Sequence, residues 1–297
     1  MRLIHLTDPH LSSLGSQRFL QLRGKRRSGY LSWYKNRRHV HLPAILENLA
    51  GAIKSEEADQ VLLTGDLVHI GLESEIAEAA GWLEQLGPPA NLMLIPGNHD
   101  NYAGDSLDAM VRHWGDYLPY GNAEGTEAGY TAGYPVLKEL EDLRIIGLNS
   151  SCTTRIFSAA GQLGAEQQSK LGSMLETGQA EGKFQCVLIH HPPFPQMTKR
   201  RKALRDDRQL KKLLTAQPPH LVLYGHLHRD LEHIHGRTHI YCTASASSTE
   251  GASYRVFDIE KSGRGWNCEM RLMCLPAGSK PSASLVITAR SSWSVLN

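Results

Sequence analysis

The sequence predicts an α/β fold in which two sheets pack together, and two observations carry this prediction. In both halves of the 297-residue chain, short apolar runs typical of buried strands alternate with segments whose apolar residues recur at helical spacing. From about residue 238 onward, strand-like segments follow one another, which predicts an antiparallel end to a two-sheet α/β sandwich. With 41% apolar and 21% charged residues, we expect a single domain over residues 1–275. A Ser-rich tail over 276–297 is expected to be loosely packed or to form an oligomer contact.

The first half supplies strands and helices in strict alternation. Helix 42–54 carries Pro43 in its first turn, where the missing N–H does no harm. Helix 73–86 stops where Gly87-Pro88-Pro89 breaks the pattern. In chain order, we expect a strand at 3–6, a helix at 42–54, a strand at 61–63, a helix at 73–86, a strand at 92–95 and a helix at 105–114.

The second half repeats the alternation and then changes to strands alone. In chain order, we expect a strand at 143–148, a helix at 165–175, a strand at 187–189, a helix at 206–214, a strand at 221–224, and strands at 239–243, 254–259 and 266–273 with a turn at 262–265.

No run approaches the roughly 20 apolar residues of a membrane span, and the first strand begins at once, so we expect no signal peptide. Five scattered cysteines favour reduced thiols in a cytoplasmic protein.

Side chains able to bind metal follow five of the predicted strands directly. They are Asp8, His10, Asp66, Asn98, His190, His226 and His228. The carboxyl ends of core strands are where open α/β sheets place their sites. Residues two apart in an extended segment point the same way, so the Asp-x-His and His-x-His pairs can each reach into one pocket. Each motif alone is weak, but five motifs in this order behind apolar strands predict a metal site.

The residue types indicate which metals and which chemistry to expect. Two carboxylates, one amide oxygen and four imidazoles without a thiolate suit Mn²⁺, Fe or Zn²⁺, with Co²⁺ or Mg²⁺ as alternatives. Seven ligands are too many for one tetrahedral ion but match two ions that share a bridging carboxylate. Two ions about 3.5–4 Å apart can clamp the attacking and the leaving oxygen of an in-line phosphoryl displacement.

The order of these motifs resembles the calcineurin-like metallophosphoesterase superfamily. The resemblance covers Asp8 to His228, about three quarters of the chain, and the doubled His190-His191 before Pro192-Pro193 is similar to the branch of cyclic-nucleotide and glycerophosphodiester phosphodiesterases. It implies the α/β/β/α sandwich of that superfamily. Two positions depart from the usual pattern, because Thr7 stands where many relatives have Ser and His69 where many have an acidic residue or Asn.

The resemblance also assigns roles to individual residues. It implies that one metal is held by Asp8, His10, Asp66 and His228, and that Asp66 bridges to a second metal held by Asn98, His190 and His226. It further implies that His99 is the catalytic imidazole, oriented by Asp100, which stabilises charge or protonates the leaving alkoxide. By contrast, His5 lies inside the first strand, and we expect it to be a core imidazole rather than a ligand.

Two short basic segments are not explained by the metal motifs. Residues 23–41 and 199–212 hold 15 of the 32 Lys and Arg in a chain of net charge +2, and the first surrounds aromatic residues at 30–34. Because each segment follows a ligand loop, we expect both at the rim of the site. The candidate substrate contacts are His69, Arg26, Arg27, Arg37 and Arg38. The alternatives are a solvated face, a funnel for an anionic substrate, a surface for anionic lipid and a site for single-stranded nucleic acid.

These patterns predict a metal-dependent phosphoesterase that acts on a small anionic phosphoester, with a phosphodiesterase favoured over a phosphomonoesterase. The expected reaction is in-line attack by a hydroxide that bridges the two metals. A nuclease or a lipid-linked pyrophosphate hydrolase of the same superfamily is the alternative within the enzymes. The alternative from another class is a metal-binding scaffold that docks a partner through residues 30–33.

Overall fold

The computed structural model describes residues 1–11, 14–17, 19–118, 133–263 and 265–296. Its strands form two six-stranded sheets. The first sheet has the order β12 (Val286–Leu296), β11 (Gly265–Leu275), β10 (Ala252–Ser262), β1 (Arg2–Leu6), β2 (Gln60–Leu63) and β3 (Leu92–Leu94). The second has the order β4 (Val136–Leu140), β5 (Leu143–Gly147), β6 (Phe184–Leu188), β7 (Leu221–Tyr224), β9 (Thr238–Cys242) and β8 (Leu231–His235).

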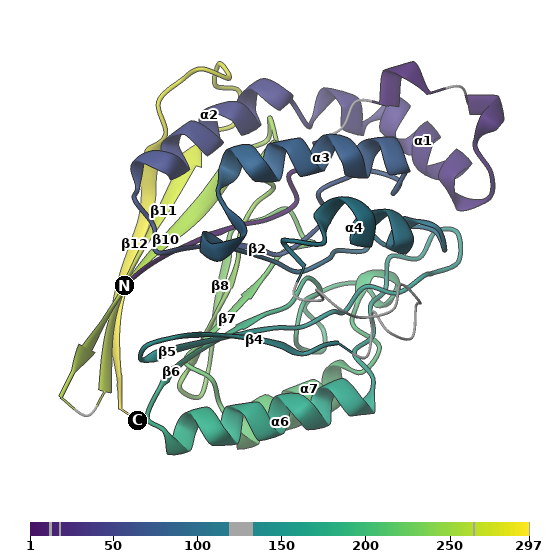
Figure 1. The fold of residues 1–297 in the computed structure, drawn as a ribbon. Helices are drawn as coiled ribbons and strands as arrows, with labels where there is room; N and C mark the ends of the chain where they lie inside the picture. Colours follow the sequence, from purple (N-terminus) through teal and green to yellow (C-terminus); the bar gives the residue numbers. More distant parts are fainter. Residues whose placement is uncertain (12–13, 18, 119–132, 264, 297) are drawn as a thin grey trace.

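Helices cover the outer face of each sheet (Figure 1). On the side of the first sheet lie α2 (Pro43–Ser55), α3 (Glu73–Leu86) and α4 (Ser106–Trp114), and on the side of the second lie α6 (Ala165–Ala180) and α7 (Asp207–Ala216). The basic segments form α1 (Lys25–Lys35) and the 3₁₀ turns η3 (Arg37–His39) and η5 (Arg200–Lys202). Further 3₁₀ turns are η1 (Leu14–Ser16), η2 (Phe19–Gln21) and η4 (Pro89–Asn91). The predicted α/β/β/α sandwich is therefore confirmed.

The central strands are mostly apolar, and β7 is apolar at every position, because both of their faces are buried. In β7, Leu221 and Leu223 belong to the large core between the sheets, whereas Val222 and Tyr224 belong to the smaller core that includes Leu210 of α7. Successive side chains of a strand point to opposite faces, so a strand covered on both sides needs apolar residues at every position. This explains the continuous apolar runs in the sequence.

Parallel pairing brings the ends of these strands together. β1, β2 and β3 run parallel to one another, and so do β5, β6, β7 and β9. Consecutive parallel strands end at the same edge of a sheet, where crossover loops leave them. The loops after β1, β2, β3, β6 and β7 are therefore gathered at one side of the molecule.

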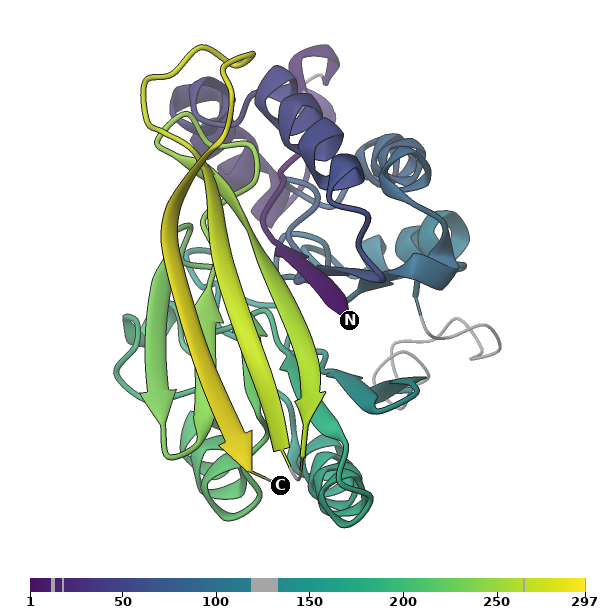
Figure 2. The ribbon, with the colours of Figure 1, turned by 90° about the vertical axis from the view of Figure 1, so that its left-hand side faces the viewer.

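Four segments differ from the prediction, for physical reasons. α1 was not predicted because it has no apolar stripe and buries only Gly29 and Trp33. β8 was not predicted because its side chains are mostly exposed, and β4 because Lys138 and Glu139 interrupt its apolar residues without strict alternation. The prediction of a loosely packed tail was wrong for residues 286–296, which form the edge strand β12 paired with β11. Figure 2 shows the long strands β10, β11 and β12 side by side.

Two further predictions concern the chain as a whole. β10 and β11 pair antiparallel up to Ser262 and Gly265, as the predicted turn requires, but Arg264 in that turn lies outside the described residues. Among the helices of the described ranges, none combines the length and the hydropathy that crossing a bilayer would take.

Candidate metal centre

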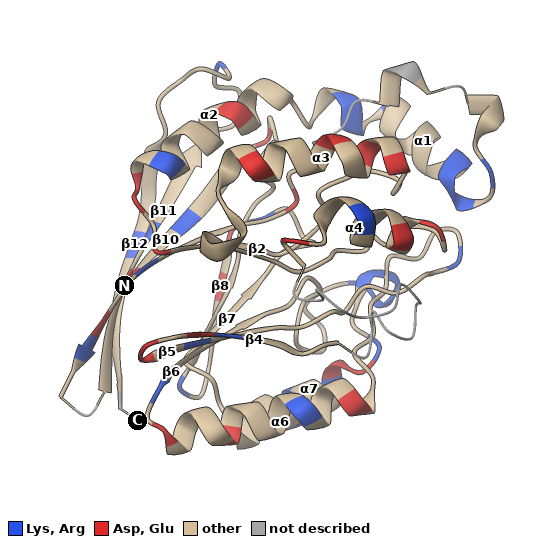
Figure 3. Ribbon diagram, in the orientation of Figure 1, with Lys and Arg blue, Asp and Glu red and all other residues tan. Residues whose placement is uncertain are grey.

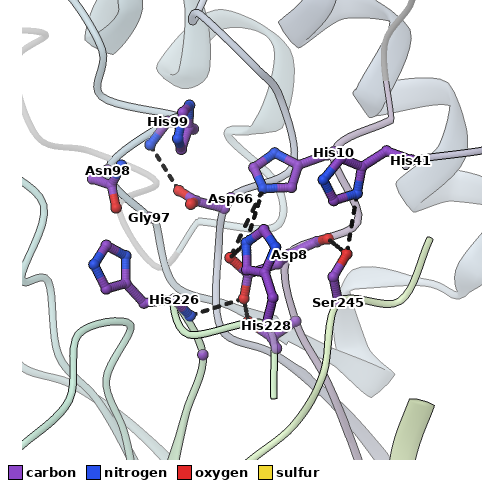
Figure 4. Close-up of polar contacts among 12 residues, drawn as sticks. Asp8, His10, His41, Asp66, Gly97, Asn98, His99, His226, His228 and Ser245 are labelled. Atoms are coloured by element: carbon purple, nitrogen blue, oxygen red, sulfur yellow. Dashed lines mark hydrogen bonds and ion pairs between the residues drawn. The ribbon is translucent and has the colours of Figure 1, made fainter. Parts of the chain in front are cut away.

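Five loops carry the predicted metal ligands, and each loop follows the carboxyl end of a strand. Three of these loops follow β1, β2 and β3 of the first sheet, and two follow β6 and β7 of the second. In chain order, the ligand candidates are Asp8, His10, Asp66, Asn98, His190, His226 and His228. All are buried except His228, whose side chain is 33% exposed. The structure brings them together, and Figure 4 shows most of them around one centre. The site is therefore built from both sheets.

Most of these residues adopt a backbone conformation that L-amino acids avoid. The φ angle is positive at five of the seven, namely Asp8 (51°), His10 (42°), Asp66 (57°), His226 (69°) and His228 (54°). Left-handed backbone costs a residue with a side chain roughly 1–2 kcal/mol. Such strain persists only where the surrounding structure enforces it, and it gathers at functional sites. The backbone of these loops therefore directs the candidate side chains toward the site, at a cost in local stability.

Two glycines allow the loops to approach each other closely. A Cβ atom on Gly97 would lie 2.2 Å from Oδ1 of Asp66, and one on Gly225 would lie 2.0 Å from Oγ1 of Thr7. No other residue fits at such distances. The Gly before Asn98 and the Gly before His226 are therefore required by the contact between loops from different strands.

One group of ligand atoms surrounds Oδ1 of Asp8. The Nε2 atom of His228 lies 3.1 Å from this oxygen, and Nε2 of His10 lies 3.4 Å from Nε2 of His228. The same oxygen is buried and has no hydrogen-bond partner among the described residues. Metal–ligand bonds of about 2.0–2.2 Å place neighbouring ligand atoms roughly 3.0–3.5 Å apart. The spacing and the unpaired oxygen both fit a metal ion.

A second group surrounds Nε2 of His190. This nitrogen lies 3.4 Å from Oδ2 of Asp66, 3.2 Å from Oδ1 of Asn98 and 3.3 Å from Nδ1 of His226. These distances also match the spacing of atoms bound to one ion. The set contains two oxygens and two nitrogens, a donor set that suits a transition metal of intermediate softness.

Carbonyl groups orient the imidazoles. The carbonyl of Val68 accepts a hydrogen bond from Nδ1 of His10 at 2.9 Å, and the carbonyl of Thr64 accepts one from Nδ1 of His190 at 2.7 Å. Because a carbonyl can only accept, each Nδ1 carries the proton. The Nε2 lone pair of each ring then faces the ligand group, because the hydrogen bond at Nδ1 fixes the tautomer and the ring orientation that a metal ligand needs.

Burial and neighbouring charges set the protonation of the ligands. Burial lowers the pKa of His10 well below its usual value, so this ring is neutral. Burial also lowers the pKa of His190, but the charge and contact of Asp66, the charge of Asp8 and the hydrogen bond to the Thr64 carbonyl together raise it to about 9. For Asp8, burial raises the pKa, yet the charges of His228 and His190 and the hydrogen bond from the Thr7 hydroxyl to Oδ2 together bring it below the usual range. These carboxylates thus favour cations, and a bound metal would take the place of the protons.

His99 lies next to the ligands and is held by its own backbone and by one carbonyl. Its backbone N–H donates to Oδ1 of Asp66 at 2.7 Å, and its Nδ1 lies 2.5 Å from the carbonyl oxygen of His69 and 3.1 Å from Nη1 of Arg37. The carbonyl contact places the proton on Nδ1 and leaves Nε2 as the ring nitrogen available for chemistry. Burial lowers the pKa of His99, and the charge of Arg37 lowers it further.

The expectation that Asp100 orients the His99 ring is corrected by the structure. The Asp100 carboxylate faces backbone groups and accepts N–H hydrogen bonds from Asp66, Gly97 and Leu67 at 2.7–2.8 Å. Burial and the nearby charge of Asp66 raise the pKa of Asp100 to about 7. Its position inside a tight turn makes Asp100 the acceptor for loop amides, so it positions the loops rather than the imidazole.

Two of the candidate substrate arginines make structural contacts away from the ligands. Arg26 forms an ion pair with Asp105, with N–O distances of 2.7 Å, and also donates to backbone carbonyls. Arg27 donates to the carbonyl of Leu22 at 2.7 Å. Successive residues of a helix point in directions about 100° apart, so a run of arginines in α1 cannot all face one site.

The other candidates divide in the same way. The Arg38 guanidinium lies 3.9 Å from the ring centroid of Tyr34, which faces solvent, whereas Arg37 reaches His99. The ring of His69 is buried and stacks on His10 with centroids 5.1 Å apart. His69 therefore acts on the site through its carbonyl group and its stacked ring. Of the four arginines, Arg37 alone contacts a predicted site residue.

His41 is a site residue that the sequence did not reveal. Its ring offers a nitrogen within 4.8 Å of those of His10 and His228, and its Nδ1 lies 2.9 Å from the hydroxyl of Ser247. Figure 4 shows the ring of His41 beside that of His10. The sequence around His41 matches no ligand motif. The residue follows η3 at the end of a basic segment, and only the folded chain brings its ring to the site.

Two curated relatives are similar over most of the chain. A probable cyclic nucleotide phosphodiesterase of Synechococcus sp. strain WH7803 is 28% identical over 239 residues, which cover 77% of this chain and 74% of the relative. A second probable cyclic nucleotide phosphodiesterase, of Synechococcus sp. strain ATCC 27144, is 27% identical over 230 residues, which cover 74% of this chain and 79% of the relative.

Solved structures share the fold. A dimetal phosphatase from Danio rerio superposes with a TM-score of 0.58 at 10% identity over 98% of this chain and 99% of that chain. A purple acid phosphatase from yellow lupin seeds superposes with a TM-score of 0.55 at 12% identity over 98% of this chain and 53% of that chain. The family model for calcineurin-like phosphoesterases matches residues 1–230. The chain that carries this ligand-lined edge between two sheets therefore belongs to the calcineurin-like phosphoesterase family.

Proposed function

We propose that the chain is a phosphodiesterase that depends on a pair of metal ions. The observation that carries the proposal is the position of Asp66. Its carboxylate belongs to the group formed with Asp8 and His10 and also to the group formed with His190 and His226, with ligand atoms within 4.8 Å in each group. A carboxylate shared by two ligand sets is what a bridged pair of ions requires.

In this proposal each ion has its own ligands besides the shared Asp66. One ion would be held by Asp8, His10 and His228, and the other by Asn98, His190 and His226. The bound pair supplies Lewis acidity toward the phosphoryl oxygens and a nucleophile that is active near neutral pH. The mixture of oxygen and nitrogen donors without thiolate favours Mn²⁺, Fe or Zn²⁺.

Residues of the chain would control the proton and the leaving group. His99 lies beside the ligand candidate Asn98, and its Nδ1–H is engaged by the His69 carbonyl, so Nε2 is the nitrogen that would first take up a proton and then pass it to the leaving alkoxide. Arg37 contacts the same ring, and its guanidinium adds positive charge on the side where the leaving oxygen becomes negative. The His69 carbonyl keeps the ring in this orientation.

Support for a diester rather than a monoester comes from the relatives. Both are described as probable cyclic nucleotide phosphodiesterases, and they share the matched region at 27–28% identity. Complete ligand groups favour an enzyme over a metal-binding scaffold, since a scaffold would not need a catalytic imidazole beside the shared carboxylate. A small anionic phosphodiester is therefore the proposed substrate.

The test compares a diester with a monoester. Purified protein loaded with Mn²⁺ should hydrolyse bis(p-nitrophenyl) phosphate with a higher kcat/KM than p-nitrophenyl phosphate. Asn98→Ala should abolish this turnover, whereas Asn91→Ala, at an exposed amide before β3, should leave it unchanged. A preference for the monoester would overturn the choice of substrate, and turnover of neither compound would favour the scaffold.

A further inference from the structure

Two basic segments that are far apart in the sequence meet beside the candidate metal centre. Lys25 of α1, Arg37 of η3, and Arg201 and Lys202 of η5 line one pocket of about 350 Å³. His99 lines the same pocket, so the pocket opens directly onto the reacting side of the site. Figure 3 shows the Lys and Arg of α1 and of η5 on the same side of the molecule.

These four cations have no carboxylate partners of their own. In the described ranges of the chain, ion pairs of at most 4.0 Å occupy other arginines, such as Arg26 with Asp105 and Arg144 with Glu181, and none of these four. Arg27 and Arg38 also have no acid partner, but Arg27 binds a carbonyl and Arg38 lies over a ring, at places away from the pocket. The convergence of the four cations on one pocket beside His99 sets them apart from a solvated basic face.

The contacts that these cations do make leave their charge available. Lys25 donates to the hydroxyl of Thr154 at 2.8 Å and lies 4.2 Å from the ring centroid of Tyr102. Both partners are neutral. The site carboxylates Asp8 and Asp66 would be neutralised by two divalent ions, so they cannot balance the pocket in the loaded enzyme.

Burial, and for Lys202 also the neighbouring positive charges, make the cationic forms unfavourable without an anion. Burial lowers the pKa of Lys25 and of Arg37. Removal from solvent lowers the pKa of Lys202, and the charges of Arg37 and Arg201 lower it further. Each of these shifts means that the cationic form is disfavoured where it stands. An anionic group placed between these residues would relieve the repulsion and supply the missing hydrogen-bond acceptors.

We propose that this pocket binds a second phosphate group of the substrate, carried by the leaving group of the scissile diester. The inference rests on the proposed function and names its substrate class, a phosphodiester with an additional phosphate monoester. The scissile diester has one negative charge and would lie at the ions, whereas the pocket offers four cations beyond them. Arginine forks and lysine ammonium groups are the side chains that recognise phosphate. His99 borders the pocket, which places the additional phosphate on the leaving-group side.

The experiment uses three dinucleotides with protein loaded with Mn²⁺. They are thymidylyl-thymidine, the same molecule with a 5′-terminal phosphate, and the same molecule with a 3′-terminal phosphate. One of the phosphorylated compounds should have a kcat/KM higher by about tenfold or more than the parent, as one charge-assisted hydrogen bond provides. Lys202→Ala and Lys25→Met should each reduce that ratio toward one. Lys212→Ala removes the same charge from an exposed position on α7 and should keep the ratio.

Direct binding provides a second readout that does not need turnover. Thymidine 3′,5′-bisphosphate should bind the loaded protein more tightly than thymidine 5′-monophosphate in calorimetric titration, and Lys202→Ala should remove the difference. Equal kcat/KM for the three dinucleotides in an enzyme that hydrolyses bis(p-nitrophenyl) phosphate would overturn the pocket assignment and leave the proposed function intact. If the protein hydrolyses no diester, the proposed function fails, and equal binding of the two nucleotides would overturn the pocket assignment as well.

Discussion

Oδ1 of Asp66 accepts the backbone N–H of His99 at 2.7 Å. This hydrogen bond joins the carboxylate shared by both ligand groups to the residue that would protonate the leaving group. Oδ2 of the same carboxylate lies 3.4 Å from Nε2 of His190. The two oxygens of Asp66 therefore have different tasks, and a change at this residue should reach both the metal content and the placement of His99.

Asp66→Asn should reduce the metal content more than any other single ligand substitution. An amide offers one oxygen and no negative charge, so it cannot hold two cations as a bridging carboxylate does. After reconstitution with Mn²⁺, the parent should contain close to two ions per chain by elemental analysis, and the variant fewer than one. Asp108→Asn, at an exposed position of α4, is the matched control and should keep two ions. Two retained ions in Asp66→Asn would show that Asp66 is not the bridge.

His99→Gln should separate proton transfer from metal binding. The ring is not part of either ligand group, so the variant should keep its metal ions. Its kcat should fall by roughly 10²–10⁴, the usual contribution of a general acid. The loss should be smaller for p-nitrophenyl esters than for alkyl esters, because a good leaving group needs less protonation. Stopped assays on both ester types would measure this, and an equal loss for both would contradict the role of His99 as a proton donor.

Arg37 and Arg38 offer a matched pair of neighbouring arginines. Arg37→Gln should lower kcat/KM for phosphodiesters and weaken its dependence on ionic strength, because Arg37 contacts His99 and lines the pocket beside it. Arg38→Gln should leave both quantities unchanged, since the Arg38 guanidinium lies over the exposed ring of Tyr34. Steady-state assays between 50 mM and 300 mM salt would test this. Equal effects of the two substitutions would mean that only the general charge of the rim matters.

The convergence of the ligand candidates could be predicted from the sequence because each lies within four residues of the end of a strand. Asp8 follows β1 and Asp66 follows β2 in the sequence, and parallel pairing makes those ends neighbours. The fold follows from the same alternation of strand and helix. Two kinds of information were therefore enough to predict where these side chains meet: the local motif after each strand, and the rule that parallel strands end at the same edge of a sheet.

The residues that the sequence misassigned depend on contacts between distant segments. Nothing local distinguishes Arg26, which pairs with Asp105, from Arg37, which reaches His99. His41 likewise joins the site only through the path of the chain. Asp100 was expected to orient the His99 ring because the two residues are adjacent in the motif. In the structure its carboxylate instead accepts hydrogen bonds from backbone amides of the surrounding loops. Such assignments require the angle of each side chain on its element, which a pattern of residue types does not contain.

His5 gives a prediction that is independent of the metals. As expected from its position in β1, it is a core residue, fully buried with ring nitrogens 2.9 Å and 2.8 Å from the hydroxyls of Thr64 and Thr243. Burial, followed by the charge of Arg255, lowers the pKa of His5 to about 3. Between the ordinary histidine pKa of about 6.5 and that value, the unfolded chain binds a proton that the folded chain does not. The contribution of His5 to the free energy of unfolding is therefore complete above about pH 6.5 and decreases as pH falls toward 3.

In metal-free protein, the free energy of unfolding of the parent should fall by about 1 kcal/mol more than that of His5→Gln between pH 6 and pH 5, measured by urea unfolding at each pH. His233→Gln, at an exposed position of β8, is the matched control. An unchanged slope in His5→Gln would mean that His5 is protonated in the folded core.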